Sequence, residues 1–207
     1  MRKLLPAAIA GLACLLCAGA AFAVTLNGTD RGENLFGSTR ADTINGKGGL
    51  DTIFGLSGND TLRGGVGDDT IHGDSTCPAG SKNPDRCNQM RGTGTDRVLG
   101  EAGDDTLAGG NGNDTVSGGT GDDNIQGGNG NDRITGGDGV DAIFGQGHRD
   151  RINPGNGRDT VDAGSGNDTV SSRDSRTPDM IDCGSGRDRA TVDRVDTVRN
   201  CESVSRR

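Results

Sequence analysis

A nine-residue period constrains this chain more than any other feature of its sequence. "GGNGNDTVS" (109–117) is followed directly by "GGTGDDNIQ" (118–126) and "GGNGNDRIT" (127–135). We call the nine positions of a unit slots one to nine. Each of these units has glycine in slots one, two and four, Asp in slot six and an aliphatic residue in slot eight. A flexible glycine-rich linker has no reason to keep such a phase. The period therefore predicts an array in which every unit is one structural element.

The same frame continues in both directions from this stretch. Further units occupy 37–45, 46–54, 55–63, 64–72, 91–99, 100–108, 136–144, 145–153, 154–162 and 163–171. A degenerate first unit, 28–36, has Glu33 in slot six and Leu35 in slot eight. Slot six is Asp in all the later units: Asp42, Asp51, Asp60, Asp69, Asp96, Asp105, Asp114, Asp123, Asp132, Asp141, Asp150, Asp159 and Asp168.

The residue types in each slot indicate the local structure. Glycines in slots one, two and four are expected to turn the backbone through positive φ, with carbonyl oxygens lining a concave turn. Slots seven to nine are expected to form a short strand, with slot eight facing inward and slots seven and nine facing outward. If one coil holds two units, each turn stacks on the turn two units further along the chain. The sequence thus predicts an all-β fold, a parallel β-roll (β-helix) solenoid with two repeats per coil.

Stacked turns of this kind predict two rows of carboxylates. One row passes through Asp105, Asp123 and Asp141. The other row is made of Asp96, Asp114, Asp132 and Asp150. Calcium takes six to eight oxygen ligands, which two stacked turns can supply and a single turn cannot.

The pattern resembles the calcium-binding nonapeptide repeats of the RTX (hemolysin-type) proteins over residues 28–171. The resemblance implies several bound calcium ions as the cofactor. We expect all thirteen slot-six Asp residues to be metal ligands, and the tightest binding between residues 100 and 144. The expected backbone ligands come from Gly110, Gly112, Gly119, Gly121, Gly128, Gly130, Gly137 and Gly139.

The scarcity of apolar residues predicts that calcium drives folding. One inward aliphatic side chain per unit is a small core to set against the conformational entropy of a glycine-rich chain. Stacked carboxylates also repel one another until a cation lies between them. We therefore expect the array to be largely unfolded without calcium.

The first 23 residues predict export. Arg2 and Lys3 precede an apolar run that ends at Ala21-Phe22-Ala23, as in a signal peptide cleaved after Ala23. A transmembrane anchor or a lipoprotein cysteine at Cys14 or Cys17 fits this segment less well. The mature chain is expected to be secreted or at the cell surface, without membrane insertion.

Four cysteines remain in the mature chain, and an even number in an exported protein predicts two disulfides. Three pairings are open, of which Cys77–Cys87 with Cys183–Cys201 is the simplest. We expect the first pair to pin an inserted loop at 73–90, although a degenerate coil is an alternative. Cys183 and Cys201 lie one coil apart in sequence, within disulfide reach at the strand spacing. We expect them to staple a C-terminal capping segment, 172–207, with a simple loop staple as the alternative.

The rest of the sequence gives little indication of a nucleic-acid partner or of a catalytic site. The formal net charge of −8 and the absence of Trp and Tyr argue against a nucleic-acid partner. The motifs H-E-x-x-H, G-x-S-x-G and the P-loop do not occur, and His72 and His148 are expected on the surface. We therefore expect no enzyme activity.

These observations favour an exported calcium-binding protein with a structural or interaction role outside the cell. The alternative is an adhesin or surface-layer module that binds a cell-surface or extracellular polymer. It would use the inserted loop or the outward threonines of slot seven: Thr43, Thr52, Thr61, Thr70, Thr106 and Thr115. An accessory domain of a hydrolase or toxin is the remote alternative.

Overall fold

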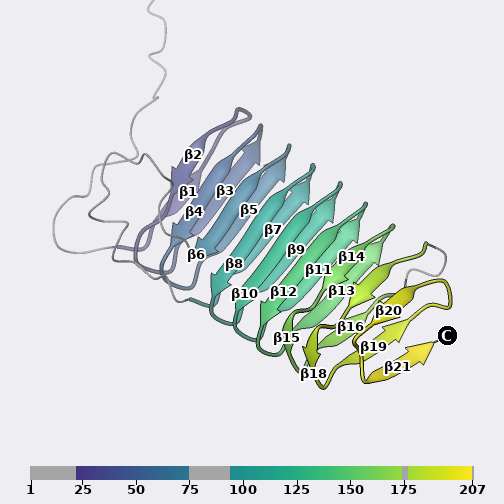
Figure 1. Cartoon of the computed structure of the whole chain (residues 1–207). Coiled ribbons are helices and arrows are strands. Elements are labelled where there is room, and N and C mark those ends of the chain that lie inside the picture. Colours follow the sequence, from purple (N-terminus) through teal and green to yellow (C-terminus); the bar gives the residue numbers. More distant parts are fainter. Residues whose placement is uncertain (1–21, 75–93, 174–176, 207) are drawn as a thin grey trace, which may run out of the picture.

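The computed structural model describes residues 22–74, 94–173 and 177–206, and within them the chain winds as a parallel β-solenoid (Figure 1). Alternate strands along the chain fall into two sheets. The ten-stranded sheet contains β1 (Thr25–Asn27), β3 (Thr43–Gly48), β5 (Thr61–Val66), β7 (Arg97–Ala102), β9 (Thr115–Thr120), β11 (Arg133–Asp138), β13 (Arg151–Asn156), β16 (Thr169–Ser171), β19 (Arg189–Val192) and β21 (Ser203–Arg206), in that order.

The second sheet has eleven strands. Its main path is β2 (Asn34–Phe36), β4 (Thr52–Leu56), β6 (Thr70–Asp74), β8 (Thr106–Asn111), β10 (Asn124–Asn129), β12 (Ala142–Gly147), β14 (Thr160–Asp162), β17 (Met180–Asp182) and β20 (Thr197–Arg199). Two short strands, β15 (Ser165–Gly166) and β18 (Ser185–Gly186), pair with each other beside this path.

The strand register confirms the predicted coil of two repeats. Thr115 is the register partner of Arg133, and Ile125 is the partner of Ile143, in each case two units further along the chain. Thr61 pairs with Arg97, so the insertion between β6 and β7 leaves the frame intact. Slots of the same number therefore stack along the roll, as the β-roll prediction requires.

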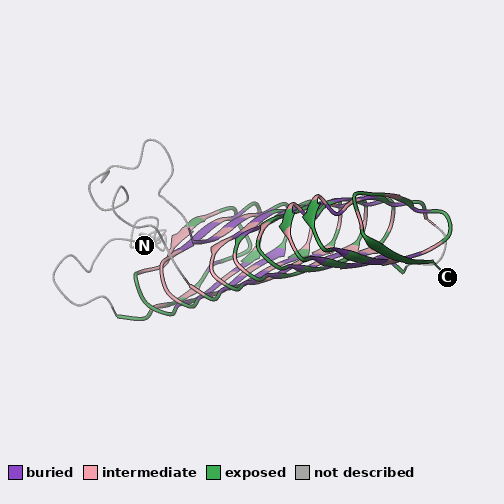
Figure 2. Cartoon of the chain, turned by 60° about the horizontal axis from the view of Figure 1, so that its bottom comes forward, coloured by how far each residue is buried: buried purple, intermediate pink, exposed green. Residues whose placement is uncertain are grey.

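The core consists of two rows of slot-eight side chains, one row from each sheet. In Figure 2, which colours the backbone by burial, buried residues recur in successive coils of the roll. Its members are at most 2% exposed: Ile44, Ile53, Leu62, Ile71, Val98, Leu107, Val116, Ile125, Ile134, Ile143, Ile152, Val161, Val170 and Ile181. The inward direction predicted for slot eight is thereby confirmed.

Most strands are longer than slots seven to nine, the length that the sequence predicts. A typical strand such as β9 runs from slot seven of one unit to slot three of the next. Gly118, in slot one, is consequently buried within the strand and not part of an open turn. A glycine-rich segment can stay extended here because the neighbouring coils supply its hydrogen bonds.

One side chain in an outward slot is buried. Phe54 lies in slot nine, where an outward side chain is expected, but it is only 6% exposed. Its ring stacks on Phe36 at 5.3 Å and on His72 at 5.1 Å between ring centroids. The rings of three neighbouring strands thus form a short aromatic stack on the outer face of the eleven-stranded sheet.

Several predictions concern residues outside the described ranges. The predicted signal segment overlaps the described chain only at Phe22 and Ala23, and both Cys77 and Cys87 fall between the described ranges. Of the loop predicted at 73–90, only Gly73 and Asp74 are described, and both belong to β6. In the described residues there is no helix of the length and apolarity needed to cross a bilayer.

Candidate metal centre

The slot-six acids form two continuous rows, one at each edge of the roll. The Asp96 row lies in the turns that lead into the ten-stranded sheet, and the Asp105 row in the turns that lead into the eleven-stranded sheet. The Asp96 row consists of Asp42, Asp60, Asp96, Asp114, Asp132, Asp150, Asp168, Asp188 and Glu202. The Asp105 row consists of Glu33, Asp51, Asp69, Asp105, Asp123, Asp141, Asp159, Asp179 and Asp196.

Each row is built by one repeated hydrogen bond. The backbone amide of a slot-six residue donates to Oδ1 of the slot-six Asp in the next coil, as from Asp105 to Asp123 at 2.9 Å. The second oxygen, Oδ2, is buried without a hydrogen-bond partner in most of the interior members: Asp51, Asp60, Asp69, Asp96, Asp105, Asp114, Asp123, Asp132, Asp141, Asp150, Asp168 and Asp188. A buried acceptor without a partner carries a desolvation cost that a bound cation would remove.

The slot-one glycine explains how these oxygens converge. A Cβ atom on Gly109 would lie 2.7 Å from Oδ2 of Asp114 and 2.7 Å from the carbonyl oxygen of Gly127. At Gly127 the corresponding distances, to Asp132 Oδ2 and the Gly145 carbonyl oxygen, are 2.7 and 2.9 Å. A side chain in slot one would therefore fill the space that a carboxylate and a carbonyl of the next coil line together.

The prediction that all three glycines turn through positive φ is wrong for slot one. Positive φ occurs in slots two and four, as at Gly110 (+114°) and Gly112 (+139°), whereas Gly109 and Gly118 lie in strands without it. Four slot-two residues other than glycine are also held at positive φ, namely Lys47, Leu56, Glu101 and Gln146, whereas Thr29, Ser38 and Asp74 are not. Glycine in slot one allows the neighbouring coil to approach closely, whereas in slots two and four it favours the backbone conformation.

Carbonyl oxygens also point from each coil toward the next at slots two and four. The nearest atom to a Cβ built on Gly128 would be the carbonyl oxygen of Gly110, and at Gly130 it would be that of Gly112. Among the described residues, no three His, Cys, Asp or Glu side chains converge on one point. Any cation in these turns must therefore take backbone oxygens as well as a carboxylate, which is the hard oxygen environment that suits calcium.

Burial perturbs the carboxylates strongly. Desolvation raises the pKa of Asp96 to about 8, with smaller contributions from the negative charges of Asp74, Asp60 and Asp114. Burial likewise raises the pKa of Asp150 to about 8. In the Asp105 row the same cause raises the pKa of Asp105 to about 7. These shifts mean that the folded turns hold negative charge poorly unless a cation accompanies it.

The two rows differ in the residue that precedes the buried acid. In three neighbouring coils of the Asp105 row, slot five holds the exposed carboxylates of Asp68, Asp104 and Asp122, and the Asp122 amide donates to Asp104 Oδ1 at 2.8 Å. In the Asp96 row the same slot contains no acid and is Asn at positions 59, 113, 131 and 167, with the Asn131 backbone amide donating to Asn113 Oδ1 at 2.8 Å. The Asp105 row therefore has the more negative surroundings.

The acids at the N-terminal end of the roll have protein partners in place of a cation. Asp42 accepts hydrogen bonds from the backbone amide of Ser38 at 2.5 Å and from its hydroxyl at 3.0 Å. Glu33 accepts in the same way from the amide and hydroxyl of Thr29, both at 2.7 Å. In each unit the partner occupies slot two, where interior units mostly have glycine. The first coil thus satisfies its acids internally.

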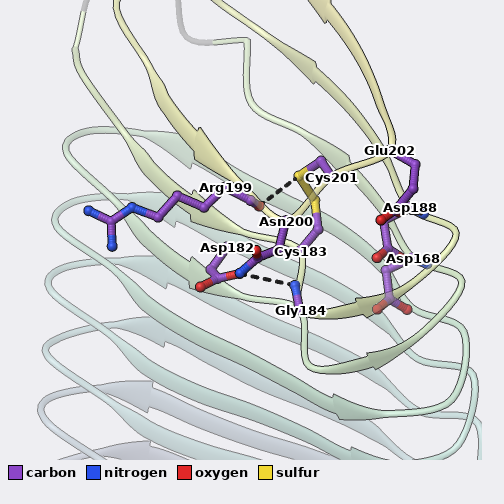
Figure 3. Close-up of a disulfide and its surroundings, with 9 residues drawn as sticks. All are labelled: Asp168, Asp182, Cys183, Gly184, Asp188, Arg199, Asn200, Cys201 and Glu202. Carbon is purple, nitrogen blue, oxygen red and sulfur yellow. Dashed lines mark hydrogen bonds between the residues drawn. A yellow bond between two sulfur atoms is a disulfide. The ribbon is translucent and has the colours of Figure 1, made fainter.

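The array extends beyond residue 171, where the sequence frame ends. Asp168 donates through its amide to Asp188 Oδ1 at 2.7 Å, and Asp188 donates to Glu202 Oε2 at 2.7 Å (Figure 3). The signal is present in "CGSGRD" (183–188), which keeps slots two, four and six of the repeat. It is displaced because the coil between β14 and β17 is longer: Thr160 pairs with Met180, whereas Ala142 pairs with Thr160.

The insertion between β6 and β7 also divides a unit differently from the sequence frame. A Cβ on Gly73 would lie 2.5 Å from Asp96 Oδ2. Gly73, and not Arg91, therefore takes slot one for Asp96. Asp74 follows in slot two and is buried, with Oδ2 accepting from the Gly94 amide at 2.9 Å. Sequence reasoning misses this buried carboxylate because a frame counted back from Asp96 does not reach it.

A disulfide joins Cys183 to Cys201, with their Cα atoms 5.2 Å apart (Figure 3). Cys183 is fully buried and takes the slot-one position of its unit, and Cys201 follows β20. The bridge links successive coils at the C-terminal end, as the spacing of 18 predicted.

A family model for the RTX calcium-binding nonapeptide repeat matches residues 27–62, 45–75, 91–125, 117–152 and 144–174. The chain belongs to the RTX nonapeptide-repeat family. The RTX repeats are calcium-binding, and the parallel roll of this structure is the fold that the resemblance implied. The match ends at residue 174, whereas the row of RTX-type acids continues in the structure to Glu202. No curated protein matches the chain.

Proposed function

We propose that this protein is an exported calcium-dependent β-roll with a structural or interaction role outside the cell. The observation that carries the proposal is the burial, without a hydrogen-bond partner, of the Oδ2 atoms of the twelve interior members named above, which lie in both rows. Calcium bound at these oxygens would neutralise the stacked charges and join consecutive coils. Folding would then be coupled to binding, as in other small metal-dependent domains.

The interior of the rows is the part that would bind ions. The carboxylates of Asp96, Asp114 and Asp132 in one row, and of Asp105 and Asp123 in the other, would each act with carbonyl oxygens of stacked turns. Asp42 and Glu33 already accept hydrogen bonds from slot two, so we do not assign ions to them. The more negative Asp105 row would bind the tighter ions.

Export would bring the chain to the calcium that it needs in order to fold. Calcium is scarce inside cells and plentiful outside, so the chain would fold after leaving the cell. The segment 2–23 supports export by its charge, apolar run and small residues before the boundary. Without catalytic motifs in the sequence, the role we propose is not enzymatic. An adhesin or surface-layer role is the second candidate, favoured by the two flat outer faces of the roll.

The test is a calcium titration of metal-free protein, followed by circular dichroism and light scattering, with magnesium as the matched control. We expect a cooperative gain of strand signal with calcium and a much weaker response to magnesium, which tolerates this irregular carbonyl environment poorly. A full strand signal in metal-free protein at neutral pH would refute calcium-driven folding. Sequencing the N-terminus of exported protein tests the signal peptide, with Val24 as the expected first residue.

A further inference from the structure

Four exposed arginines form a straight file on the outer face of the ten-stranded sheet. This arginine file consists of the slot-seven residues Arg97, Arg133, Arg151 and Arg189. Arg133 and Arg151 are register partners on neighbouring strands. One threonine strand separates Arg97 from Arg133, and another separates Arg151 from Arg189. Since neighbouring strands lie about 4.8 Å apart, consecutive file positions are spaced at about 5 or 10 Å.

The acidic side chains in the strands of this sheet lie away from the file, at the far ends of those strands: Glu101 in β7 and Asp138 in β11. Slots seven and nine of the ten-stranded sheet contain no Asp or Glu in any described strand. Arg63, in slot nine of β5, forms a salt bridge at 3.0 Å to Glu101 near the end of β7. That is the one salt bridge among the residues the structure describes, and it does not include the file. The guanidinium groups of the file are therefore available to a ligand.

The opposite face has a different charge. In the eleven-stranded sheet the described slots seven and nine contain one arginine, Arg199, together with Asp162 and Asp182. Negative charge is also concentrated in the turns that lead into this sheet, where Asp104 and Asp122 lie. A protein of net charge −8 thus concentrates positive charge on one flat face. Solubility alone does not require this segregation, because any outward slot accepts either charge.

A second file of polar groups runs beside the arginines. Slot nine lies two positions further along each strand, about 7 Å away, on the same side of the sheet. In the central strands this slot holds Ser117, Thr135, Asn153 and Ser171. The face therefore combines a line of guanidinium groups, which bind carboxylate or sulfate oxygens in a bidentate manner, with a parallel line of hydroxyl and amide groups.

We propose that this face binds a linear anionic polysaccharide laid along the roll axis. Its acidic groups would contact the arginine file, and its hydroxyl groups would contact the slot-nine file. A lipid surface would meet the arginines but would give the hydroxyl file no chain of complementary groups. The proposal rests on the proposed function, because the two files align only when the coils are stacked.

The test measures retention of calcium-loaded protein on immobilised dextran sulfate, with uncharged dextran as the matched control. We expect retention on dextran sulfate only, weakening steeply with added salt. The double variant Arg133→Gln with Arg151→Gln should lose about tenfold or more in affinity, as expected for two charge-assisted contacts. The control, Arg158→Gln with Arg199→Gln, removes the same charge from exposed positions elsewhere and should change affinity less than about twofold.

Three results would overturn the proposal. These are equal losses in the two double variants, no retention of the folded protein, or binding to phosphatidylserine vesicles without binding to dextran sulfate. Circular dichroism with calcium is recorded first on every variant. A protein that does not fold with calcium contradicts the proposed function, whereas a folded protein that ignores dextran sulfate contradicts this inference alone.

Discussion

The backbone amide of Asp114 donates to Oδ1 of Asp132 at 2.9 Å, while Oδ2 of Asp132 is buried without a hydrogen-bond partner. One carboxylate thus has two separate tasks. Its first oxygen sets the stacking of neighbouring coils, and its second is left for a ligand. The repetition of this pair along both edges links the geometry of the roll to calcium.

Replacing one buried carboxylate by its amide should weaken calcium binding without removing the stacking hydrogen bond. In Asp123→Asn the Oδ1 acceptor for Asp105 is kept, but the unpartnered oxygen becomes an NH₂ group. We expect the calcium midpoint of folding to rise by about tenfold, which corresponds to about 1.4 kcal/mol. The neighbouring Asp122→Asn removes the same charge from an exposed site and should shift the midpoint far less. Equal shifts would show that only net charge matters.

Adding a methyl group at a positive-φ glycine should disrupt the array. Gly130 has φ +140°, and a Cβ there would overlap the carbonyl oxygen of Gly112. Backbone strain alone costs about 1–3 kcal/mol, and the overlap adds to it. Gly147→Ala is the control, because its Cβ would come no closer than 3.6 Å to any neighbouring atom and its φ is not positive. Thermal unfolding in calcium should show a large loss for Gly130→Ala and a small change for the control.

The folded state of the calcium-free protein should be more stable at acid pH than at alkaline pH. Burial raises the pKa of Asp96 and Asp150 to about 8 and that of Asp60 to about 7, above the value of about 4 in an unfolded chain. The folded state therefore binds protons that the unfolded state releases, so its stability falls as pH rises from about 4 to about 8. Circular dichroism of resin-stripped protein should show more strand at pH 5 than at pH 8. With calcium the dependence should reverse, because protons compete with the metal.

The thin core should be sensitive to single deletions. Ile125→Ala removes most of a side chain that is fully buried and should cost about 2–5 kcal/mol. Val140→Ala, at a residue 54% exposed in a turn that leads into the same sheet, should stay within about 0.5 kcal/mol. Denaturant unfolding of the calcium-loaded protein measures both changes. A small loss at Ile125 would mean that calcium, and not the core, carries the stability of the central coils.

Reducing the C-terminal disulfide should loosen the last coil. Cys183 and Cys201 are separated by 18 positions in sequence, and for a loop of this size chain entropy predicts a loss of about 3 kcal/mol on removal of the bridge. The double variant Cys183→Ala with Cys201→Ala should expose β20 and β21 to protease in the presence of calcium. The central strands provide the internal control and should remain protected. Uniform proteolysis along the chain would contradict a local role for the bridge.

Most of the architecture can be predicted from the sequence because the repeat is short and strictly phased. The period places Ile125 in the core and Asp123 at an edge, and the pairing of alternate units follows from two repeats per coil. The acids that the sequence misplaces lie where the phase changes. Asp188 falls outside the predicted array because a longer coil precedes it. Asp74 falls within the predicted loop because the chain leaves the coil inside a unit.

The sequence by itself determined the coil, the inward file and the thirteen slot-six Asp residues of the array, because each depends only on residue type and spacing. The tertiary structure decided which atoms of those residues are left for a ligand. Whether Oδ2 of Asp42 or of Asp132 lacks a partner depends on Ser38 and on the stacked turns, which spacing does not reveal. The alignment of Arg133 with Arg151 on one face likewise arises only when strands from alternate units lie side by side.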